Sequence, residues 1–385
     1  MADIGNDEWL ADYFQPAAEV RDRKQILDWA KAPGHWSGCG KHVKSTDIKG
    51  KIHAGDILGE GATARVEKVT FRSVTMARKK IRVRGMLVEQ LREEANIMEK
   101  LVHRHIVELV GTYTHGQNQL YILTFPAAAC CLQGFLDDIE DIRSGVADQE
   151  DVIKRFEALG FNGFLFPEDP NNTKSLKRPL GFLSSILGCV TEAVSFIHKN
   201  NVRHRDLKPK NILLGPRQVY LADFGVSRDL RDSNHSITDG IAGTRWYLAP
   251  EVARGEKHHM SPADIFSLGC VFLAVASVLY SAPHAQYEKT IREADQTKKV
   301  ADITKYLNDL RQRASRAGMA ANDVLTCAPK HLLALIESML SHDPKARPEA
   351  RQINDTLYEL GGIDQIYHGK CCKKATEYIS KLIGR

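Results

Sequence analysis

The sequence lacks the features that mark a secreted, zinc-finger or membrane-spanning protein. Its eight cysteines form no Cys-x-x-Cys pair and no zinc-finger spacing, and four of them lie as the adjacent pairs Cys130 with Cys131 and Cys371 with Cys372. The N-terminus, MADIGNDEWLADYF, is acidic and has neither the basic start nor the apolar core of a signal peptide. The longest apolar run, residues 265–280, is interrupted by Ser and Gly and is too short to span a bilayer comfortably. These absences predict an intracellular, cytoplasmic protein with reduced cysteines and no transmembrane segment.

A concentrated positive charge is also missing. The 53 Lys and Arg residues are nearly balanced by 48 Asp and Glu residues, so the net charge is +5, and the basic residues form no stripe interleaved with aromatics. Nucleic-acid binding therefore has little support. A length of 385 residues exceeds one small core, while the apolar and charged fractions are ordinary for a globular protein.

What the sequence does contain is a dense cluster of polar chemistry at residues 202–214, VRHRDLKPKNILL. Asp206 can accept a proton from an attacking hydroxyl, and Lys208 can neutralise a phosphoryl group in transit. Asn211 offers a carbonyl oxygen to a hard cation. A polar loop after a buried helix would explain any one of these residues, but it explains the set poorly. The pattern predicts an enzyme that transfers phosphate.

This segment resembles the catalytic loop of the eukaryotic protein kinases, in which His-Arg-Asp is followed five residues later by Asn. The matching residues here are His204, Arg205, Asp206 and Asn211. Twelve residues after Asn211, the run VYLADFG ends in the Asp-Phe-Gly that the family uses to bind metal. The resemblance implies that Asp223 holds magnesium and that Asn211 helps to hold a second ion.

Residues 57–66, ILGEGATARV, resemble the glycine-rich loop of the family. The resemblance implies that Leu58, Gly59 and Gly61 approach the nucleotide and that Val66 covers the adenine. Ala64 stands where the third glycine is usual, so close approach at that corner is slightly compromised.

The extended run VTMARKKI at residues 74–81 contains two candidate phosphate-binding lysines. Strand alternation places Lys79 and Lys80 on opposite faces, and Lys79 matches the family lysine that holds the α and β phosphates. Along the following helical pattern, Glu94 falls where the family has the glutamate that pairs with this lysine. Glu93, one residue around the helix, is the alternative and is expected to be exposed.

Residues 120–136, LYILTFPAAACCLQGFL, align with the hinge between the two lobes of the family. The resemblance implies that the backbone of Phe125 and Ala127 meets the adenine edge, with Ala77 and Leu213 contributing to the apolar column around the base. Cys130 and Cys131 occupy places where glycine and a small or acidic ribose contact are usual. This departure predicts weaker or wetter ribose binding.

The segment from residue 223 to 251 ends in GTRWYLAPE, which resembles the substrate-facing loop of serine/threonine kinases. Thr244 would contact the catalytic Asp206 and Lys208, and the combination of Lys208 with Thr244 favours Ser/Thr over Tyr substrates. Glu251 would pair with Arg347. Asp264, at the start of the long apolar helix expected over residues 265–280, matches the residue that supports the catalytic-loop backbone.

Four polar residues in the same segment raise the question of regulation. Ser233, Ser236 and Thr238 could be phosphorylated by an upstream kinase to supply an anion for Arg205 and Arg228. Asp239 could partly substitute for phosphate, or it could simply be a solvated loop aspartate.

The resemblance therefore implies an α+β fold with two lobes, a small one built on antiparallel strands with one main helix and a large, mostly helical one, and ATP in the cleft between them. We expect a kinase domain at 51–360, with a small lobe at about 51–124, a large lobe at about 128–360 and a surface insertion at about 138–177. An N-terminal extension with Trp9, Trp29 and Trp36 precedes it, and a basic tail follows at 361–385. The insertion ends in FPEDPNNTKSLKRP, which reads as a loop by its Pro and Asn content.

The implied reaction is transfer of the γ-phosphoryl group of ATP to Ser or Thr hydroxyls of protein substrates, with Mg²⁺ as cofactor. A pseudokinase scaffold is the alternative, but Lys79, Asp206, Asn211 and Asp223 are all present. A small-molecule phosphotransferase is disfavoured by GTRWYLAPE, which shapes a peptide site. The substrate, the oligomeric state and the roles of the flanking segments do not follow from the sequence.

Overall fold

A computed structural model describes residues 17–31, 42–44, 51–60, 64–82, 92–115, 119–167, 173–225, 227–229, 245–255, 260–293, 298–320 and 329–373. The chain divides into two compact units. Unit 1 comprises Met1–Cys130 and Leu214–Gly225, and unit 2 comprises Cys131–Leu213 and Val226–Arg385. The chain therefore passes from one unit to the other three times.

Unit 1 is built on a six-stranded sheet with the order β1-β5-β6-β4-β3-β2. Its strands are β1 His42–Lys44, β2 Ile52–Glu60, β3 Ala64–Phe71, β4 Val74–Arg82, β5 Glu108–His115 and β6 Gln119–Phe125. All neighbouring pairs from β2 to β5 are antiparallel, whereas β1 runs parallel to β5. The predicted antiparallel sheet is thus confirmed for five strands. The N-terminal extension adds the sixth as a parallel edge strand.

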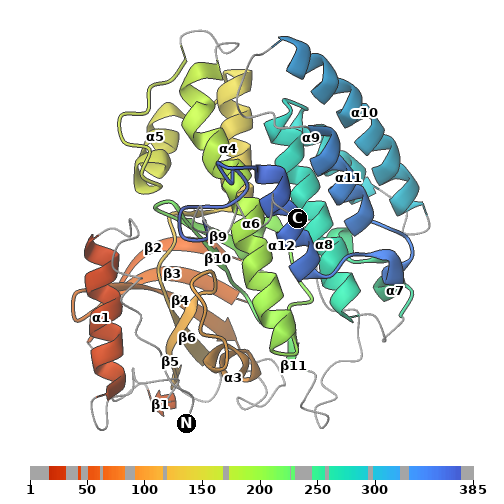
Figure 1. Ribbon diagram of the computed structural model, residues 1–385. Helices are drawn as coiled ribbons and strands as arrows, with labels where there is room; N and C mark the ends of the chain where they lie inside the picture. The colour runs from red at the N-terminus through yellow and green to blue at the C-terminus, as the bar shows by residue number, and fades with distance from the viewer. Residues whose placement is uncertain are drawn as a thin grey trace. The chain divides into compact units, whose positions relative to one another are not determined.

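Helix α1, Ala17–Lys31, covers one face of this sheet (Figure 1). Its buried residues Glu19, Asp22, Ile26 and Trp29 are spaced three or four apart, so they line one side of the helix. Ile26 and Trp29 join a core cluster with residues of β3 to β6, and the Trp29 ring meets Phe71 edge-on at 5.2 Å. The N-terminal extension is therefore part of the core of unit 1.

The return segment of unit 1, residues 214–225, is fixed by backbone hydrogen bonds. Strand β10, Gln218–Leu221, lies beside residues 105–107: Leu221 N–H donates to the His105 carbonyl at 2.8 Å, and Val107 N–H donates to the Leu221 carbonyl at 3.1 Å. The Tyr220 hydroxyl donates to Glu19 Oε1 of α1 at 2.6 Å. These bonds fix the segment that leads to residues 222–225. Within unit 1, Gly225 then lies close to Lys79 of β4 and to Glu94 of helix α3, Glu93–Glu99.

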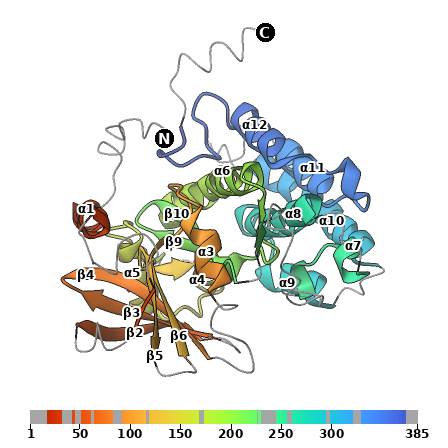
Figure 2. The ribbon, with the colours of Figure 1, turned by 90° about the horizontal axis from the view of Figure 1, so that it is seen from below.

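Unit 2 is mostly helical, as predicted. Figures 1 and 2 show α12 lying along α6, with α8 and α11 beside them. The helices are α4 Leu132–Ser144, α5 Gln149–Ala158, α6 Lys177–Lys199, α7 Pro250–Ala253, α8 Met260–Leu279, α9 His284–Glu293, α10 Lys299–Ala320, α11 Pro329–Met339 and α12 Ala350–Gly361. The remaining short strands are β7 Cys130–Cys131, β8 Val202–Arg203, β9 Ile212–Gly215 and β11 Arg228–Asp229. Strand β11 pairs antiparallel with β8, and β9 lies between β10 and β7.

Two helices of unit 2 are long and apolar enough to cross a membrane by length and composition. They are α6 and residues Ser261–Leu279 of α8, and 72% and 83% of their most apolar windows are buried inside the protein. The run 265–280 was expected to be too short to span a bilayer, but the helix that contains it begins further upstream and reaches the necessary length. Since core helices of soluble proteins pass the same test, this is weak support for a membrane span.

The predicted surface insertion at 138–177 contributes to the core instead. Its acidic stretch is divided between the end of α4 and α5, and Phe156 of α5 is fully buried. Phe156 belongs to an aromatic cluster whose other members are Phe135, Phe161, Phe164 and Phe182. The predicted loop was also wrong for residues 173–179, because Thr173–Leu176 forms a 3₁₀ turn that leads directly into α6.

Candidate active site

Unit 1 holds a lysine between two carboxylates. Lys79 lies in β4, opposite Val66 of β3 and Ile122 of β6. Its Nζ is 2.8 Å from both oxygens of Glu94, in the first turn of α3, and 2.7 Å from Oδ1 of Asp223. Lys80 points elsewhere, because its Nζ lies over the Tyr121 ring at 5.7 Å. The structure therefore brings together Lys79, Glu94 and Asp223.

The two carboxylates control the charge of this lysine. Burial of the ammonium group alone would lower the pKa of Lys79, but attraction to Glu94 and Asp223 and the hydrogen bonds to both outweigh burial and raise it well above its ordinary value. Lys79 is therefore a permanent cation at neutral pH. Such a group can bind phosphate oxygens but cannot act as a proton acceptor.

Gly225 leaves space for the cluster of Lys79, Glu94 and Asp223, because it has no side chain. A Cβ on Gly225 would lie 3.3 Å from Asp223 Oδ1, 3.3 Å from Glu94 Oε2 and 3.5 Å from Lys79 Nζ. Asp223 itself has a left-handed backbone, with φ of 66°. The turn at 223–225 thus aims the carboxylate at Lys79, and glycine leaves room for it.

The residues predicted to surround the nucleotide are distributed over several strands. Leu58 and Gly59 lie on the exposed strand β2, and Gly59 pairs with Val66 of β3. Ala77, two residues before Lys79, is buried in β4, and Phe125 is buried at the end of β6. Ala127 and Leu213 are half-buried. Gly61 lies outside the described residues.

Unit 2 gathers the acid, amide and second lysine of the catalytic-loop pattern in one turn. Lys208 Nζ lies 2.5 Å from Oδ2 of Asp206. Asn211, which ends the 3₁₀ turn Pro209–Asn211, donates its Nδ2 to the carbonyl of Asp206 at 2.8 Å and to its Oδ2 at 3.1 Å. These bonds orient the Asn211 side chain and leave Oδ1 as the atom that a cation would bind.

Asp264 of α8 holds the backbone of this turn, as the sequence predicts. It accepts hydrogen bonds from the N–H groups of His204 at 2.9 Å and Arg205 at 2.8 Å, and it lies 2.9 Å from His198 Nε2. Burial would raise the pKa of Asp264, but the hydrogen bond from His198, the nearby imidazoles and the Arg205 N–H outweigh burial and lower it. The anchor is therefore ionised at neutral pH. It fixes Arg205 in a left-handed conformation with φ of 68°.

The segment from Arg245 to α7 in unit 2 is anchored by two buried cations. Arg347 forms a two-point ion pair with Glu251, with distances of 2.6 and 2.9 Å, and neither side chain is exposed. Lys299, which the sequence analysis did not identify, donates to the carbonyls of Trp246 at 2.8 Å and Leu248 at 2.7 Å. Nothing in the sequence distinguishes Lys299 from its neighbour Lys298.

Several predicted residues of the segment 223–251 lie outside the described part of the chain. They are Thr244 and the regulatory candidates Ser233, Ser236, Thr238 and Asp239. For Arg228, the backbone pairs with Arg203 across β11 and β8.

Comparison with known proteins adds a family to these observations. A family model described as protein kinase domain matches residues 170–358. Cyclin-dependent kinase D-1 of Arabidopsis thaliana is 27% identical over 316 residues, which cover 77% of this chain and 68% of that protein. Serine/threonine-protein kinase ICK of Mus musculus is 34% identical over 187 residues, and serine/threonine-protein kinase MAK of Homo sapiens is 31% identical over 236 residues. These matches cover 45% and 55% of this chain, but only 29% and 37% of the two relatives.

Proposed function

We propose that this chain is a protein kinase that transfers the γ-phosphoryl group of ATP to protein serine or threonine hydroxyls, because a protein kinase model matches residues 170–358 and similar proteins are serine/threonine kinases. The observation that carries the proposal is the joint presence of two residue sets. Asp206, Lys208 and Asn211 share one turn in unit 2, while Lys79 is held by two carboxylates in unit 1.

Each residue has a distinct task in the proposed reaction. Asp206 orients the substrate hydroxyl and accepts its proton as the new oxygen–phosphorus bond forms and the bond to ADP breaks. Lys208 and Lys79 balance negative charge on the phosphates, and Glu94 fixes the position of Lys79. Catalysis on this account is mainly positioning and electrostatics, because no covalent enzyme intermediate is required.

The oxygen donors of the chain fit magnesium. The Asp223 carboxylate in unit 1 and Asn211 Oδ1 in unit 2 are each hard ligands of the kind that Mg²⁺ prefers, and bound Mg²⁺ would neutralise charge on the nucleotide phosphates. The remaining nucleotide contacts are assigned to Leu58, Gly59, Gly61, Val66, Ala77, Phe125, Ala127 and Leu213.

We also propose a preference for Ser and Thr over Tyr, on the basis of Lys208 and the family position of Thr244. An upstream kinase acting on the segment 223–251 is part of the same proposal, as is an intracellular, cytoplasmic location, which fits reduced cysteines and a reaction that consumes ATP.

The test compares wild type with Asp206→Ala for magnesium-dependent transfer of radiolabelled phosphate from ATP to a mixed library of Ser, Thr and Tyr peptides. We expect labelled phosphoserine and phosphothreonine with the wild type and almost none with the variant. Equal labelling by the two proteins would support the pseudokinase scaffold instead, with the signal arising from a contaminant. Labelled phosphotyrosine would overturn the predicted specificity.

A further inference from the structure

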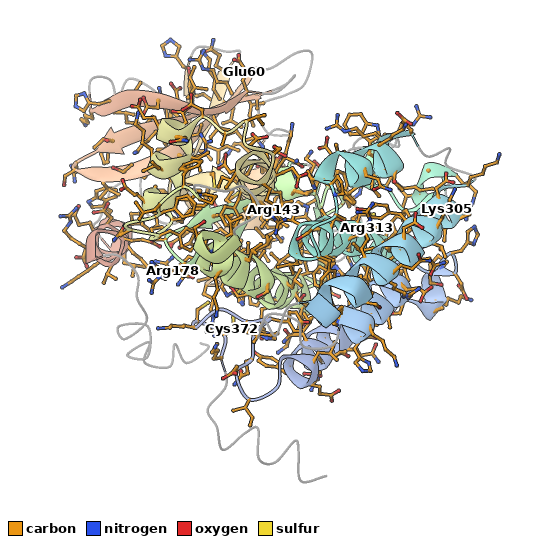
Figure 3. All side chains as sticks on the ribbon, turned by 90° about the horizontal axis from the view of Figure 1, so that it is seen from above. Glu60, Arg143, Arg178, Lys305, Arg313 and Cys372 are labelled. Carbon is orange, nitrogen blue, oxygen red and sulfur yellow. The ribbon has the colours of Figure 1, made fainter. Side chains whose placement is uncertain are left out.

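Three cysteine sulfurs converge in unit 2 although their residues are distant in the sequence. Cys189 lies in the middle of α6, whereas Cys371 and Cys372 lie on the segment that follows α12, where Figure 3 labels Cys372. The Sγ atoms of Cys189 and Cys371 are 3.8 Å apart, and all three sulfurs lie within 4.8 Å of one another. Cys189 and Cys372 are buried, and Cys371 is half-buried.

The segment that carries Cys371 and Cys372 is docked by contacts that do not involve sulfur. Its Tyr367 carbonyl accepts from Gly188 N–H at 2.8 Å, and its Ile366 carbonyl accepts from the Ser184 hydroxyl at 3.0 Å. A Cβ on Gly188 would lie only 2.4 Å from the ring of His368, so α6 has glycine where the segment crosses it. The fold itself therefore sets the positions of the three thiols.

Polar contacts on the other side of the segment add to this anchoring. The His368 ring stacks on Tyr358 of α12 with centroids 3.6 Å apart, and His368 Nε2 lies 2.9 Å from Asn354 Oδ1. The Tyr358 hydroxyl donates to the Cys372 carbonyl at 2.6 Å. A site that is held in place before its ligand arrives loses little entropy on binding.

The turn before Cys371 contacts the sulfur atoms of Cys189 and Cys371 through Gly369. Gly369 N–H donates to Cys189 Sγ at 3.3 Å, and a Cβ on Gly369 would lie 3.1 Å from Cys189 Sγ and 3.2 Å from Cys371 Sγ. A backbone N–H that donates to sulfur is an outer contact of the kind that orients the ligands of metal sites.

The sulfur spacing excludes a disulfide and is compatible with a metal site as well as with hydrogen-bonded thiols. A disulfide requires about 2.05 Å between sulfurs, which is far shorter than the 3.8 Å between Cys189 and Cys371. Tetrahedral zinc with bonds of about 2.3 Å to each sulfur places the sulfurs about 3.8 Å apart. Three thiolates are also soft ligands, which favour Zn²⁺ over the magnesium of the proposed active site.

We propose that Cys189, Cys371 and Cys372 bind one Zn²⁺ ion, with a further ligand in the fourth position. The ion clamps the segment after α12 to the middle of α6. This segment lies beyond residue 358, where the kinase family match ends, so the clamp is an addition to the family domain. Binding requires three thiolates and therefore releases protons from the cysteines.

The first experiment measures metal content in the full chain, purified without a histidine tag under reducing conditions and dialysed against ZnSO₄ and then metal-free buffer. Elemental analysis should find about one zinc per chain in the wild type. The double variant Cys371→Ser, Cys372→Ser should lose it. Cys131→Ser, a cysteine outside the cluster, should retain it.

The second measurement uses wild-type protein alone, so it does not depend on the folding of a variant. Replacement of zinc by Co²⁺ should give the sulfur-to-metal charge-transfer absorption and the intense visible bands of tetrahedral cobalt thiolate. Removal of the metal by a chelator should lower the thermal unfolding temperature of the wild type, and adding zinc back should restore it.

Four results would overturn the proposal. The first is wild-type protein that contains no zinc after dialysis, and the second is a double variant that contains as much zinc as the wild type. The third is a cobalt spectrum that lacks the thiolate charge-transfer band. The fourth is an intact mass that is lower by two hydrogens, together with a peptide that carries a Cys189–Cys371 disulfide.

Discussion

Lys79 and Lys80 show what a residue pattern can and cannot decide. Strand alternation places the two lysines on opposite faces of β4, and the pairing with Glu94 was predicted from motif order. The structure shows the pair at 2.8 Å and places Lys80 over Tyr121. The additional contact from Lys79 to Asp223 could not be predicted, because it depends on the course of residues 214–225 through unit 1.

The first prediction concerns the pairing of Lys79. Glu94→Gln removes one of its two carboxylates, and a hydrogen bond to a charged group contributes about 1.5–3 kcal/mol. We therefore expect kcat/KM for ATP to fall about tenfold to a hundredfold. Glu93→Gln is the matched control, because Glu93 is the adjacent residue of α3 and should change kcat/KM little. Similar losses in both variants would contradict the assignment of Glu94.

The second prediction concerns the pH dependence of stability. Burial raises the pKa of Glu19 above 4.5, although the hydrogen bond from Tyr220 and the charge of Arg23 oppose it. The folded state thus binds a proton more tightly than the unfolded state. This contribution to stability is fully present below pH 4.5 and is lost as the pH rises through the folded pKa.

Glu19→Gln removes that titration and keeps an oxygen that can accept from Tyr220. Relative to the wild type, the variant should gain stability as the pH rises from about 4.5 towards neutrality. Urea unfolding midpoints across this range would measure the difference. A difference between the two proteins that is constant with pH, or that falls as the pH rises, would refute the prediction.

At the scale of elements, α1 shows the limit of local patterns. The sequence indicates an N-terminal extension that contains tryptophans, but it does not reveal that Trp29 packs against Phe71 of β3. That contact joins residues 42 positions apart, so it requires the tertiary fold.

The third prediction tests this docking. Trp29→Ala should lower the free energy of unfolding by about 3–5 kcal/mol, because it leaves a large cavity in the core of unit 1. Hydrogen-exchange protection of β3 and β4 should fall with it. Leu27 lies on the same helix but is 49% exposed, so Leu27→Ala should lower the free energy of unfolding by under about 1 kcal/mol. If the two variants cost the same, α1 does not contribute to the core as described.

The fourth prediction concerns the ion pair that anchors α7. Arg347→Met leaves Glu251 buried without its partner and should lower the free energy of unfolding by about 3–5 kcal/mol. Arg351→Met removes an exposed cation 4.0 Å from Asp355 and should cost no more than about 1 kcal/mol. Equal unfolding midpoints in urea for these two variants would contradict the role of the buried pair.

The region 138–177 was misread for a physical reason. Pro and Asn are frequent in loops, so the composition of FPEDPNNTKSLKRP predicts a loop. An acidic stretch likewise predicts a solvent-exposed segment. Phe156 and Phe161 are instead drawn into the core by Phe135 and Phe182, which lie on α4 and α6. Composition alone cannot show such a long-range contact.

At the scale of the whole molecule, the order of motifs along the chain was sufficient to predict the α+β fold, while the catalytic roles of the candidate residues stay a prediction. Motif order works because each motif is a short continuous segment whose residues are close in the sequence. It fails for contacts that lie outside the motifs, such as those of Lys299 with the carbonyls of Trp246 and Leu248, or the approach of three cysteines from α6 and the segment after α12. Their residues carry no recognisable spacing.

The central claim is that Asp206 acts in the chemical step and contributes little to nucleotide affinity. The most direct test measures Mg²⁺–ATP affinity and turnover in the same preparation of Asp206→Asn, with the wild type beside it. We expect a Kd within about threefold of the wild type, a change of ~0.6 kcal/mol, and a kcat lower by at least about a hundredfold. A variant that binds ATP and retains wild-type kcat would contradict the account.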